Sequence, residues 1–373
     1  MIIKNGSVFV SGQYYSYDIE ITDGNITNIG PTLVGNDVID ATGKYVFPGM
    51  IETHIHGADL VSVNDGEDCV RRVSKKLPEY GITSYTPTPT ANTIETSLKA
   101  VRGIRAAKGT EGADILGISF YSPYRNRSDA FYKDNVAPTK EHTLEMMDHD
   151  LSDVLMMCVA PELPGGMEWI KWAVSQGIIV MIGFTEATTQ QIYEAASYGA
   201  TLLDHFFNGF PKMSHHEEGS TIGCLLDDRL FCQMQFDHIH VVKPFIDLTI
   251  RVKGVEKVIA TCDFSVYVGA PDGDYMHGVH RDIPVVKKDG SVRSKATGKL
   301  VTGSRSLDEV MRIGLAKGYT MEELGLMFTE NAGTMLGLKD RGKIEIGRRG
   351  DIVIMDEGLN VDKTIILGNV VYE

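Results

Sequence analysis

Two histidines separated by one residue, His54 and His56, are the residues whose spacing points most directly to chemistry. They lie in the segment PGMIETHIHG, which follows an apolar run typical of a strand. Side chains alternate between the two faces of a strand, so both imidazoles are expected to face the same way. Two imidazoles on one face can share a metal ion. Two ordinary polar residues on a strand would show the same spacing, so the pair alone does not establish a metal site.

Five further apolar runs also end in polar side chains, at positions where the loop to a following helix should begin. The segments are ISFYSPY around Tyr121, GFTEAT from residue 183, LDHFFNG around His205, FDHIHV around His240, and TCDF around Asp263. A buried Asp or His at a strand end costs free energy unless it is paired or binds a metal. A histidine pair followed by another histidine and an aspartate, all at strand ends, therefore indicates a metal-dependent site.

The elements that must position these residues alternate between apolar runs and amphipathic helical patterns. The runs begin near residues 45, 115, 154, 178, 201 and 258, and helical patterns cover 69–80, 167–176 and 190–198. Buried strands that alternate with helices predict a parallel sheet. Six or more such units over about 290 residues favour a (β/α)8 TIM barrel over a doubly wound sheet. Active sites of such barrels lie at the carboxyl ends of the strands, where these polar residues are expected.

The two ends of the chain have a different pattern from its middle. Both predict short strands, with turns at Asp23-Gly24 and at Gly368-Asn369. Neither end is long enough to bury a core alone. We therefore expect residues 1–45 and 345–373 to form one small composite β-sandwich domain, and residues 46–344 to form the α/β barrel.

Composition excludes several classes of function. The chain has 373 residues, and 36 Lys and Arg against 50 Asp and Glu give a net charge of −14, which disfavours a nucleic-acid partner. No run reaches the roughly 18 apolar residues of a membrane span, and the first ten residues do not resemble a signal peptide. The five cysteines are widely spaced and odd in number, which favours thiols in a reducing cytoplasm.

Motifs along nearly the whole chain resemble the amidohydrolase superfamily, and within it the N-acetylglucosamine-6-phosphate deacetylases. PGMIETHIHG resembles the metal-binding first strand of that family, and VAPE at 159–162 matches a family tetrapeptide. DHFFNGF resembles the family segment HLFNAM, FDHIHV resembles DGIHV, and TCDFSVYVGAPDG resembles the stretch that opens with the catalytic aspartate. The resemblance therefore rests on several motifs in the same order along the chain, and not on the histidine pair alone.

The resemblance assigns roles to residues of this chain. It implies metal ligands at His54, His56 and His205, and an aspartate at Asp263 that activates water and then protonates the leaving amine. It implies that His240 contacts the substrate and that the backbone at Asn208 and Gly209 holds a substrate phosphate. It also implies a homo-oligomer, with a dimer as the family default.

Three positions depart from the family pattern. The metal-binding Glu of the fourth-strand segment LEGP falls on Tyr121, and the metal-binding His of the fifth-strand segment GHSNAT falls on Phe184. The basic residue that grips the sugar phosphate falls on His216, and a neutral imidazole binds phosphate less well than a guanidinium group. We expect Tyr121, Phe184 and His216 to contact the substrate instead, with Arg125 and Arg127 as candidate sources of positive charge.

The remaining ligands suffice for one metal ion. His54, His56 and Asp263 are three candidates, with His205 as a possible fourth, and catalytic zinc generally has three protein ligands and one open position. The expected cofactor is therefore one divalent ion, zinc first, with iron or manganese as alternatives. Glu186, two residues after Phe184, is a candidate replacement for a lost ligand.

These observations predict a metal-dependent hydrolase that cleaves an amide or related C–N bond of a small, polar, amino-sugar-derived molecule. Two alternatives stay open at this point. One is a degenerate paralogue that binds a ligand without turnover, because two ligand positions have changed. The other is a related reaction, such as deamination or sugar–amine cleavage.

Overall fold

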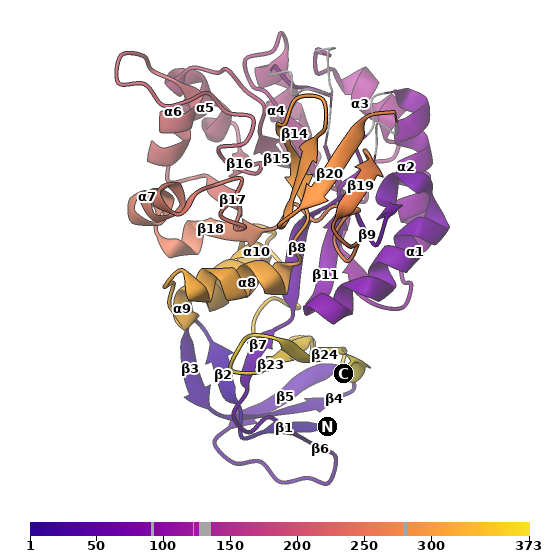
Figure 1. Cartoon of the computed structure of the whole chain (residues 1–373), viewed down its shortest axis with the longest axis vertical. Helices are drawn as coiled ribbons and strands as arrows, with labels where there is room; N and C mark the ends of the chain where they lie inside the picture. The colour runs from indigo at the N-terminus through magenta and orange to yellow at the C-terminus, as the bar shows by residue number, and fades with distance from the viewer. Residues whose placement is uncertain (91–92, 122, 127–135, 279–281) are drawn as a thin grey trace.

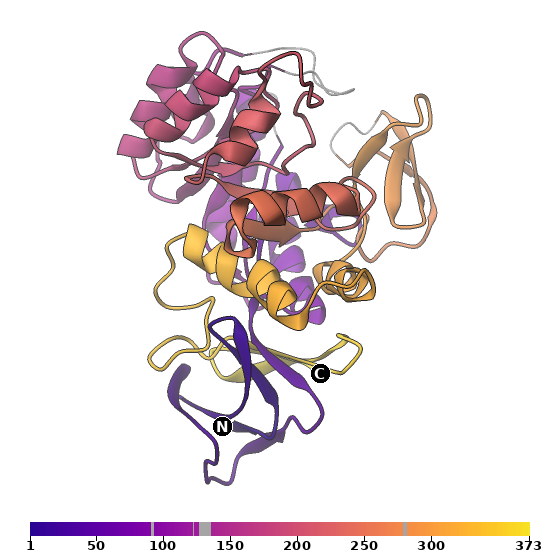
Figure 2. The same cartoon turned by 90° about the vertical axis from the view of Figure 1, so that its left-hand side faces the viewer.

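The computed structural model divides into a large α/β part and a smaller β part, which lies below it in Figure 1. It describes residues 1–90, 93–121, 123–126, 136–278 and 282–373. Both termini lie in the β part, as Figures 1 and 2 show from two sides. The large part contains the parallel strands whose ends carry the polar residues identified above.

Parallel strands of the large part form two sheets that follow the order of the chain. One sheet has the order β12-β11-β8 and the other the order β13-β14-β15-β16-β17-β18. Isolated parallel bridges join Thr90 to Tyr121 and Ile55 to Phe264, so the two sheets meet at both edges. The strands are β8 (Met50–Ile55), β11 (Ile82–Pro87), β12 (Asp114–Ile115), β13 (Ile118–Phe120), β14 (Val154–Val159), β15 (Ile179–Ile182), β16 (Ala200–Leu203), β17 (Phe231–Gln235) and β18 (Val258–Thr261).

Helices connect these strands, so the predicted alternation of strand and helix is confirmed. The helices are α1 (Glu67–Lys76), α2 (Ile94–Ala107), α3 (Lys140–Met146), α4 (Gly166–Ser175), α5 (Thr189–Ser197), α6 (Ser220–Leu226), α7 (Lys243–Lys253), α8 (Leu307–Ala316), α9 (Met321–Gly325) and α10 (Asn331–Met335). Short helical turns are η1 (Val63–Asp65), η2 (Leu77–Tyr80), η3 (Val255–Lys257) and η4 (Leu326–Glu330).

Burial and capping explain why these residues form these elements. Every residue of β8 and of β11 is buried, as expected for strands covered on both faces. Helices α2 and α5 begin with capping boxes, in which the Thr93 and Thr188 hydroxyls accept from backbone N–H groups of the first turn. Strand ends and helix starts are therefore well defined, which fixes where the intervening loops begin.

The small β part combines both ends of the chain in one sheet, of order β25-β24-β23-β7-β2-β3, with a second sheet of order β5-β4-β1-β6. The strands are β1 (Ile2–Lys4), β2 (Ser7–Val10), β3 (Gln13–Ser16), β4 (Asp18–Thr22), β5 (Asn25–Gly30), β6 (Val38–Asp40), β7 (Tyr45–Pro48), β23 (Ile352–Met355), β24 (Val361–Ile366) and β25 (Asn369–Tyr372). Ile3, Ile19, Val46, Ile352 and Ile365 belong to one buried cluster that joins the two sheets.

Two details of this part refine the expectations from sequence. The boundary expected after residue 45 falls at the first residue of β7, which continues to Pro48 within the composite sheet.

The predicted turn at Gly368-Asn369 is one residue off. Ile366 pairs with Asn369, so the two-residue loop is Leu367-Gly368, and both of these residues have positive φ. The Asp23-Gly24 turn is confirmed, with positive φ at both residues.

An antiparallel sheet between β18 and α8 is a feature that sequence reasoning missed. It consists of β19 (Gly273–Met276), β20 (Pro284–Lys288), β21 (Ser291–Ser294) and β22 (Leu300–Gly303), paired in that order. Figure 2 shows it standing to one side of the parallel strands. The short hairpin of β9 (Gly57–Ala58) and β10 (Val61–Ser62) follows the histidine pair directly.

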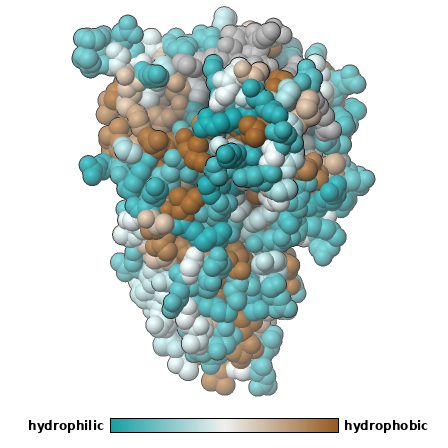
Figure 3. Space-filling view, viewed as in Figure 1, coloured by the Kyte–Doolittle hydropathy of each residue, from teal (hydrophilic) through white to brown (hydrophobic). Residues whose placement is uncertain are grey.

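The surface in Figure 3 is mostly polar, with apolar residues gathered on the side of α6 and α7. Leu226, Val242 and Phe245 are among the exposed apolar residues there. Among the described residues, no helix combines the length and the apolar character needed to cross a membrane. All five cysteines lie in the described part of the chain, and none of them forms a disulfide bond.

Candidate functional site

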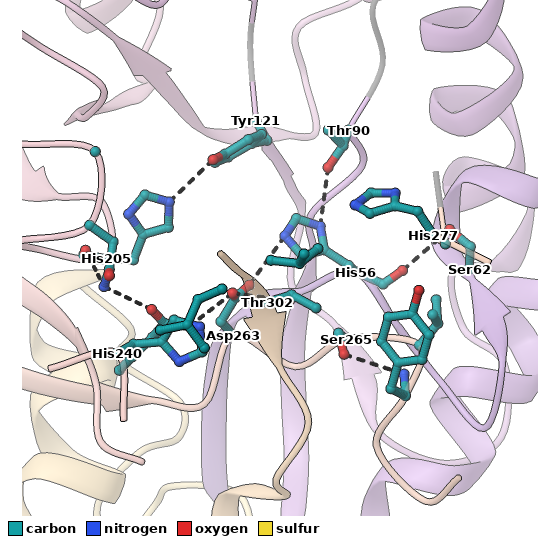
Figure 4. A pocket seen from close by; sticks show the side chains of 18 of the residues that line it. His56, Ser62, Thr90, Tyr121, His205, His240, Asp263, Ser265, His277 and Thr302 are labelled. Carbon is teal, nitrogen blue, oxygen red and sulfur yellow. Dashed lines mark hydrogen bonds and ion pairs between the residues drawn. The ribbon is translucent and has the colours of Figure 1, made fainter. Parts of the chain in front are cut away.

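A pocket opens where the parallel strands end, between the loops that follow them and the antiparallel sheet (Figure 4). The predicted residues that line it are His56, Tyr121, Phe184, His205, Asn208, Gly209, His240 and Asp263. His54 lies directly behind His56 and is fully buried. The strand-end residues identified in sequence are thus brought to one place from six separate loops or strands.

Three of these residues form a group whose ligand atoms could hold one metal ion. The ligand atoms of His54, His56 and Asp263 all lie within 4.8 Å of one another. Nε2 of His54 is 3.1 Å from Nε2 of His56, and Asp263 Oδ1 is 3.3 Å from the latter and 3.6 Å from the former. Three electron-pair donors therefore converge on one point.

Hydrogen bonds on the far side of each ring explain why Nε2 faces this point. Nδ1 of His56 lies 2.7 Å from the carbonyl oxygen of Thr88, and Nδ1 of His54 lies 3.1 Å from Gln233 Oε1. Because both partners can only accept, Nδ1 carries a hydrogen in each ring, and Nε2 offers a lone pair whenever the ring is neutral. Two lone pairs that face each other across 3.1 Å repel unless a cation or a proton lies between them. The donor set therefore fits a divalent cation.

Buried charges around His54 also favour a positive charge. Burial alone would lower the pKa of His54, but the carboxylates of Asp204 and Asp263 raise it to about 9. Burial opposes ionisation of Asp263 as well, yet the two neighbouring histidines hold its pKa well below the usual range. The site thus attracts cations and keeps Asp263 ionised.

Asp263 is held by neutral donors on the side away from the histidines. Its Oδ2 accepts from Gln235 Nε2 at 2.9 Å and from Thr302 Oγ1 at 3.1 Å. Its φ of 51° lies in the left-handed region, and φ is also positive at Phe184 (48°) and His205 (27°). Positive φ in a residue other than glycine strains the backbone, and such strain recurs at active sites.

His240 lines the pocket and is oriented by Asp237. Its Nδ1 is 2.6 Å from Asp237 Oδ2, and its backbone N–H donates to Asp237 Oδ1 at 2.9 Å. Burial raises the pKa of Asp237, but the contacts with His240 outweigh this effect and lower it. The ionised Asp237 fixes the orientation of His240, and Nε2 of the ring is buried without a hydrogen-bond partner in the described structure.

Tyr121 and Phe184 form an aromatic wall beside the histidine pair. Their ring centroids are 5.3 Å apart, and the Tyr121 hydroxyl lies 3.2 Å from His205 Nε2. The guanidinium of Arg125 stacks behind both rings, 4.6 Å from the Tyr121 centroid. Arg125 is buried and does not line the pocket.

Several predicted residues are not part of the metal group in the described structure. His205 lies against the pocket but is not one of the three clustered ligands, because its Nε2 faces the Tyr121 hydroxyl. Glu186 is exposed and lines a separate surface hollow, so its predicted role as a replacement ligand is not supported. His216 is exposed and does not line the pocket, and its role in substrate binding stays a prediction. Arg127 lies outside the described residues.

Sequence reasoning missed the polar residues that support the group from behind. Gln233 and Gln235 alternate in β17, and this is the same period-two pattern that singled out the histidine pair. Thr302 comes from β22, about 40 positions after Asp263 in the chain. Asp204 was noticed only as the neighbour of His205, although its carboxylate lies 3.2 Å from His54 Nδ1.

Comparison of sequences relates the chain to sugar-phosphate deacetylases over its whole length. No protein-family model matches it. It is 28% identical to an N-acetylglucosamine-6-phosphate deacetylase of Lysinibacillus sphaericus, over 99% of this chain and 97% of the relative. It is 27% identical to an N-acetylgalactosamine-6-phosphate deacetylase of Escherichia coli O157:H7, over 94% of each.

Comparison of structures leads to the same group of proteins. An N-acetylglucosamine-6-phosphate deacetylase from Pasteurella multocida superposes with a TM-score of 0.90 at 22% identity, covering 99% of this chain and 98% of that one. One from Thermotoga maritima gives a TM-score of 0.85 at 23% identity and covers 100% of both chains. At these identities the superpositions show that the fold is shared.

Proposed function

Since this chain is a divergent member of the amidohydrolase superfamily and a homologue of the N-acetylglucosamine-6-phosphate deacetylases, we propose that it is a metal-dependent hydrolase. Its reaction would be cleavage of an amide C–N bond in a small, polar, amino-sugar-derived molecule. The observation that carries this proposal is the convergence of His54, His56 and Asp263 in the pocket that also contains His240.

A divalent cation held by these residues would lower the pKa of a water molecule and polarise a carbonyl group. Zinc fits two imidazoles and one carboxylate with an open position, and iron or manganese would fit as alternatives. Asp263, ionised and facing the histidines, is placed to accept a proton from attacking water and to pass it to the leaving amine. His240, oriented by Asp237, would contact the carbonyl or a neighbouring polar group of the substrate.

The arrangement of the strands also supports this function. We infer that the two parallel sheets, which meet at both edges, are the wall of a (β/α)8 barrel, with the pocket at the carboxyl ends of its strands. We likewise infer a composite β-sandwich from residues 1–45 and 345–373, extended to the end of β7. A homodimer and a cytoplasmic location stay predictions from the sequence.

The substrate differs, on this proposal, from that of the curated relatives. Among the described residues that line the pocket none is Lys or Arg, so they offer no permanent positive charge to a phosphate. Tyr121, Phe184, Tyr267 and Leu300 add aromatic and apolar surface. A substrate with a larger apolar or planar part, or one that lacks the phosphate, fits this lining better than a compact sugar phosphate.

N-acetylglucosamine 6-phosphate is therefore expected to be a poor substrate. With Zn²⁺ supplied at one ion per chain, kcat/KM for acetate release should stay below about 10⁴ M⁻¹s⁻¹, the lower end of the ordinary enzyme range. Unphosphorylated N-acetylglucosamine and N-aryl acetamides carrying a planar ring should be assayed beside it. A value of about 10⁴ M⁻¹s⁻¹ or above for the phosphate would contradict the proposed preference. If none of these three substrates is hydrolysed in a metal-dependent reaction, the proposed function itself is contradicted.

Restoring the two family residues should increase the metal capacity of the site. In Tyr121→Glu with Phe184→His, a carboxylate and an imidazole would replace the aromatic wall next to His205. We expect a second ion per chain and higher deacetylase activity toward N-acetylglucosamine 6-phosphate. Elemental analysis after dialysis measures the first effect, with Tyr121→Gln and Phe184→Leu together as the matched control. An unchanged metal content would mean that these positions do not correspond to the family ligands.

A further inference from the structure

Asp204 is a buried carboxylate to which neither the family resemblance nor the proposed reaction assigns a role. It follows β16 and has no exposed surface. Its Oδ1 lies 3.2 Å from Nδ1 of His54, and its Oδ2 lies 3.7 Å from Nε2 of His205. It therefore lies on the side of the His54 ring opposite to the metal group.

The burial of this carboxylate calls for a compensating positive charge. An ionised carboxyl group away from water is costly unless it is paired. In the described part of the chain its ion pairs are both with histidines, and the thiol of Cys158 also lies next to it. Imidazoles compensate a carboxylate only while they carry charge. A metal ion on Nε2 of His54 would supply that charge in place of the proton that the ring otherwise carries.

The surrounding backbone makes room for the Asp204 side chain. Gly183 packs directly against it, and a Cβ atom at that position would lie only 2.9 Å from Cβ of Asp204. The backbone N–H of Asp204 donates to the carbonyl of Ile182 at 2.9 Å, which fixes the residue beside the end of β15. Close packing therefore restricts the Asp204 side chain and keeps its carboxylate next to His54.

We propose that Asp204 is a positioning residue for the metal ion, which pairs electrostatically with the Nδ1 side of the His54 ring and contributes the second of two negative charges that balance a divalent cation. Asp263 contributes the first charge from within the metal group. A carboxylate behind a metal-binding imidazole fixes the ring and strengthens its donation to the metal. The inference rests on the proposed metal-dependent function and names a residue that sustains it.

Gln233 offers a way to move this charge without changing the architecture. Its Oε1 lies 3.1 Å from the same Nδ1 of His54 and accepts from the backbone N–H of His205 at 3.2 Å. Its Nε2 donates to the hydroxyl of Thr53 at 2.7 Å. A glutamate at this position keeps the two contacts that Oε1 accepts, from His54 and from His205. It also keeps the contact with Thr53, because the Thr53 hydroxyl can rotate and become the donor.

The test measures Zn²⁺ affinity by competition with a chelating dye, on the full chain and without any substrate. Asp204→Asn keeps the shape and an acceptor but removes the charge, and should weaken Zn²⁺ binding by about 10- to 100-fold. Adding Gln233→Glu should return most of the lost affinity, because the charge again faces Nδ1 of His54. Asp227→Asn removes another buried carboxylate, which pairs with Arg229 away from the site, and should leave the affinity unchanged.

Two results would overturn the inference: Asp204→Asn binding Zn²⁺ within about threefold of the parent, or no recovery in the double variant. A recovery cannot be explained by a purely structural role, because Gln233→Glu adds a second buried change instead of repairing the first. Failure of the proposed function would look different, because the parent protein itself would then bind no Zn²⁺.

Discussion

The variant with both His54→Ala and His56→Ala should contain no bound divalent metal and hydrolyse no amide substrate. Two of the three converging ligand atoms would be removed, and a single carboxylate, Asp263, cannot hold the ion in a site of this kind. Elemental analysis of the dialysed protein measures the first effect, and acetate release measures the second. The gain in melting temperature that Zn²⁺ gives to the parent should also disappear, because an ion stabilises only the state that binds it.

The same variant should keep its fold but lose stability, because His54 is buried and its removal leaves Asp204 without one of its two ion-pair partners. The β8 backbone remains paired with β11, and Glu52 still accepts from the Thr261 hydroxyl on β18. Circular dichroism checks this point, and His149→Ala, which removes an exposed histidine far along the chain, is the matched control. Full metal occupancy in the double variant would show that the ion binds elsewhere.

Asp263→Asn should lower turnover by about 100-fold or more, the range in which a positioned acid–base group contributes. The amide has the size of the carboxyl group, but it can neither accept a proton from water nor pass one to the leaving amine. The loss should appear in kcat when the variant is assayed with metal supplied in excess and its metal content measured.

Thr302→Val separates the role of the carboxylate from that of its surroundings. This change removes the hydroxyl that donates to Asp263 Oδ2 but leaves the Gln235 donor and the carboxylate in place. Its effect on turnover should therefore be much smaller than that of Asp263→Asn. If Asp263→Asn instead turns over a good substrate at the parent rate, another group must move the proton.

The alternation of side chains along a strand explains which parts of the site could be predicted from the sequence. The spacing of His54 and His56 predicted two rings on one face, and their Nε2 atoms do face one point. The same pattern at Gln233 and Gln235 was overlooked because an amide is not a metal ligand. Asp204 could not be assigned, because a carboxylate next to a histidine in the chain indicates nothing about a ring on another strand.

What the sequence determined by itself is local: strand and helix alternation, the positions of turns, and polar residues at strand ends. These follow from side-chain period and backbone preference, which act over a few residues. The tertiary structure alone decided which of those polar groups meet. It places Asp263 with the histidine pair, turns His205 toward Tyr121, leaves Glu186 at the surface, and brings Thr302 from the antiparallel sheet to Asp263. Such meetings depend on how strands far apart in the chain pack together, and distances of 3 to 4 Å are set only when that packing is complete.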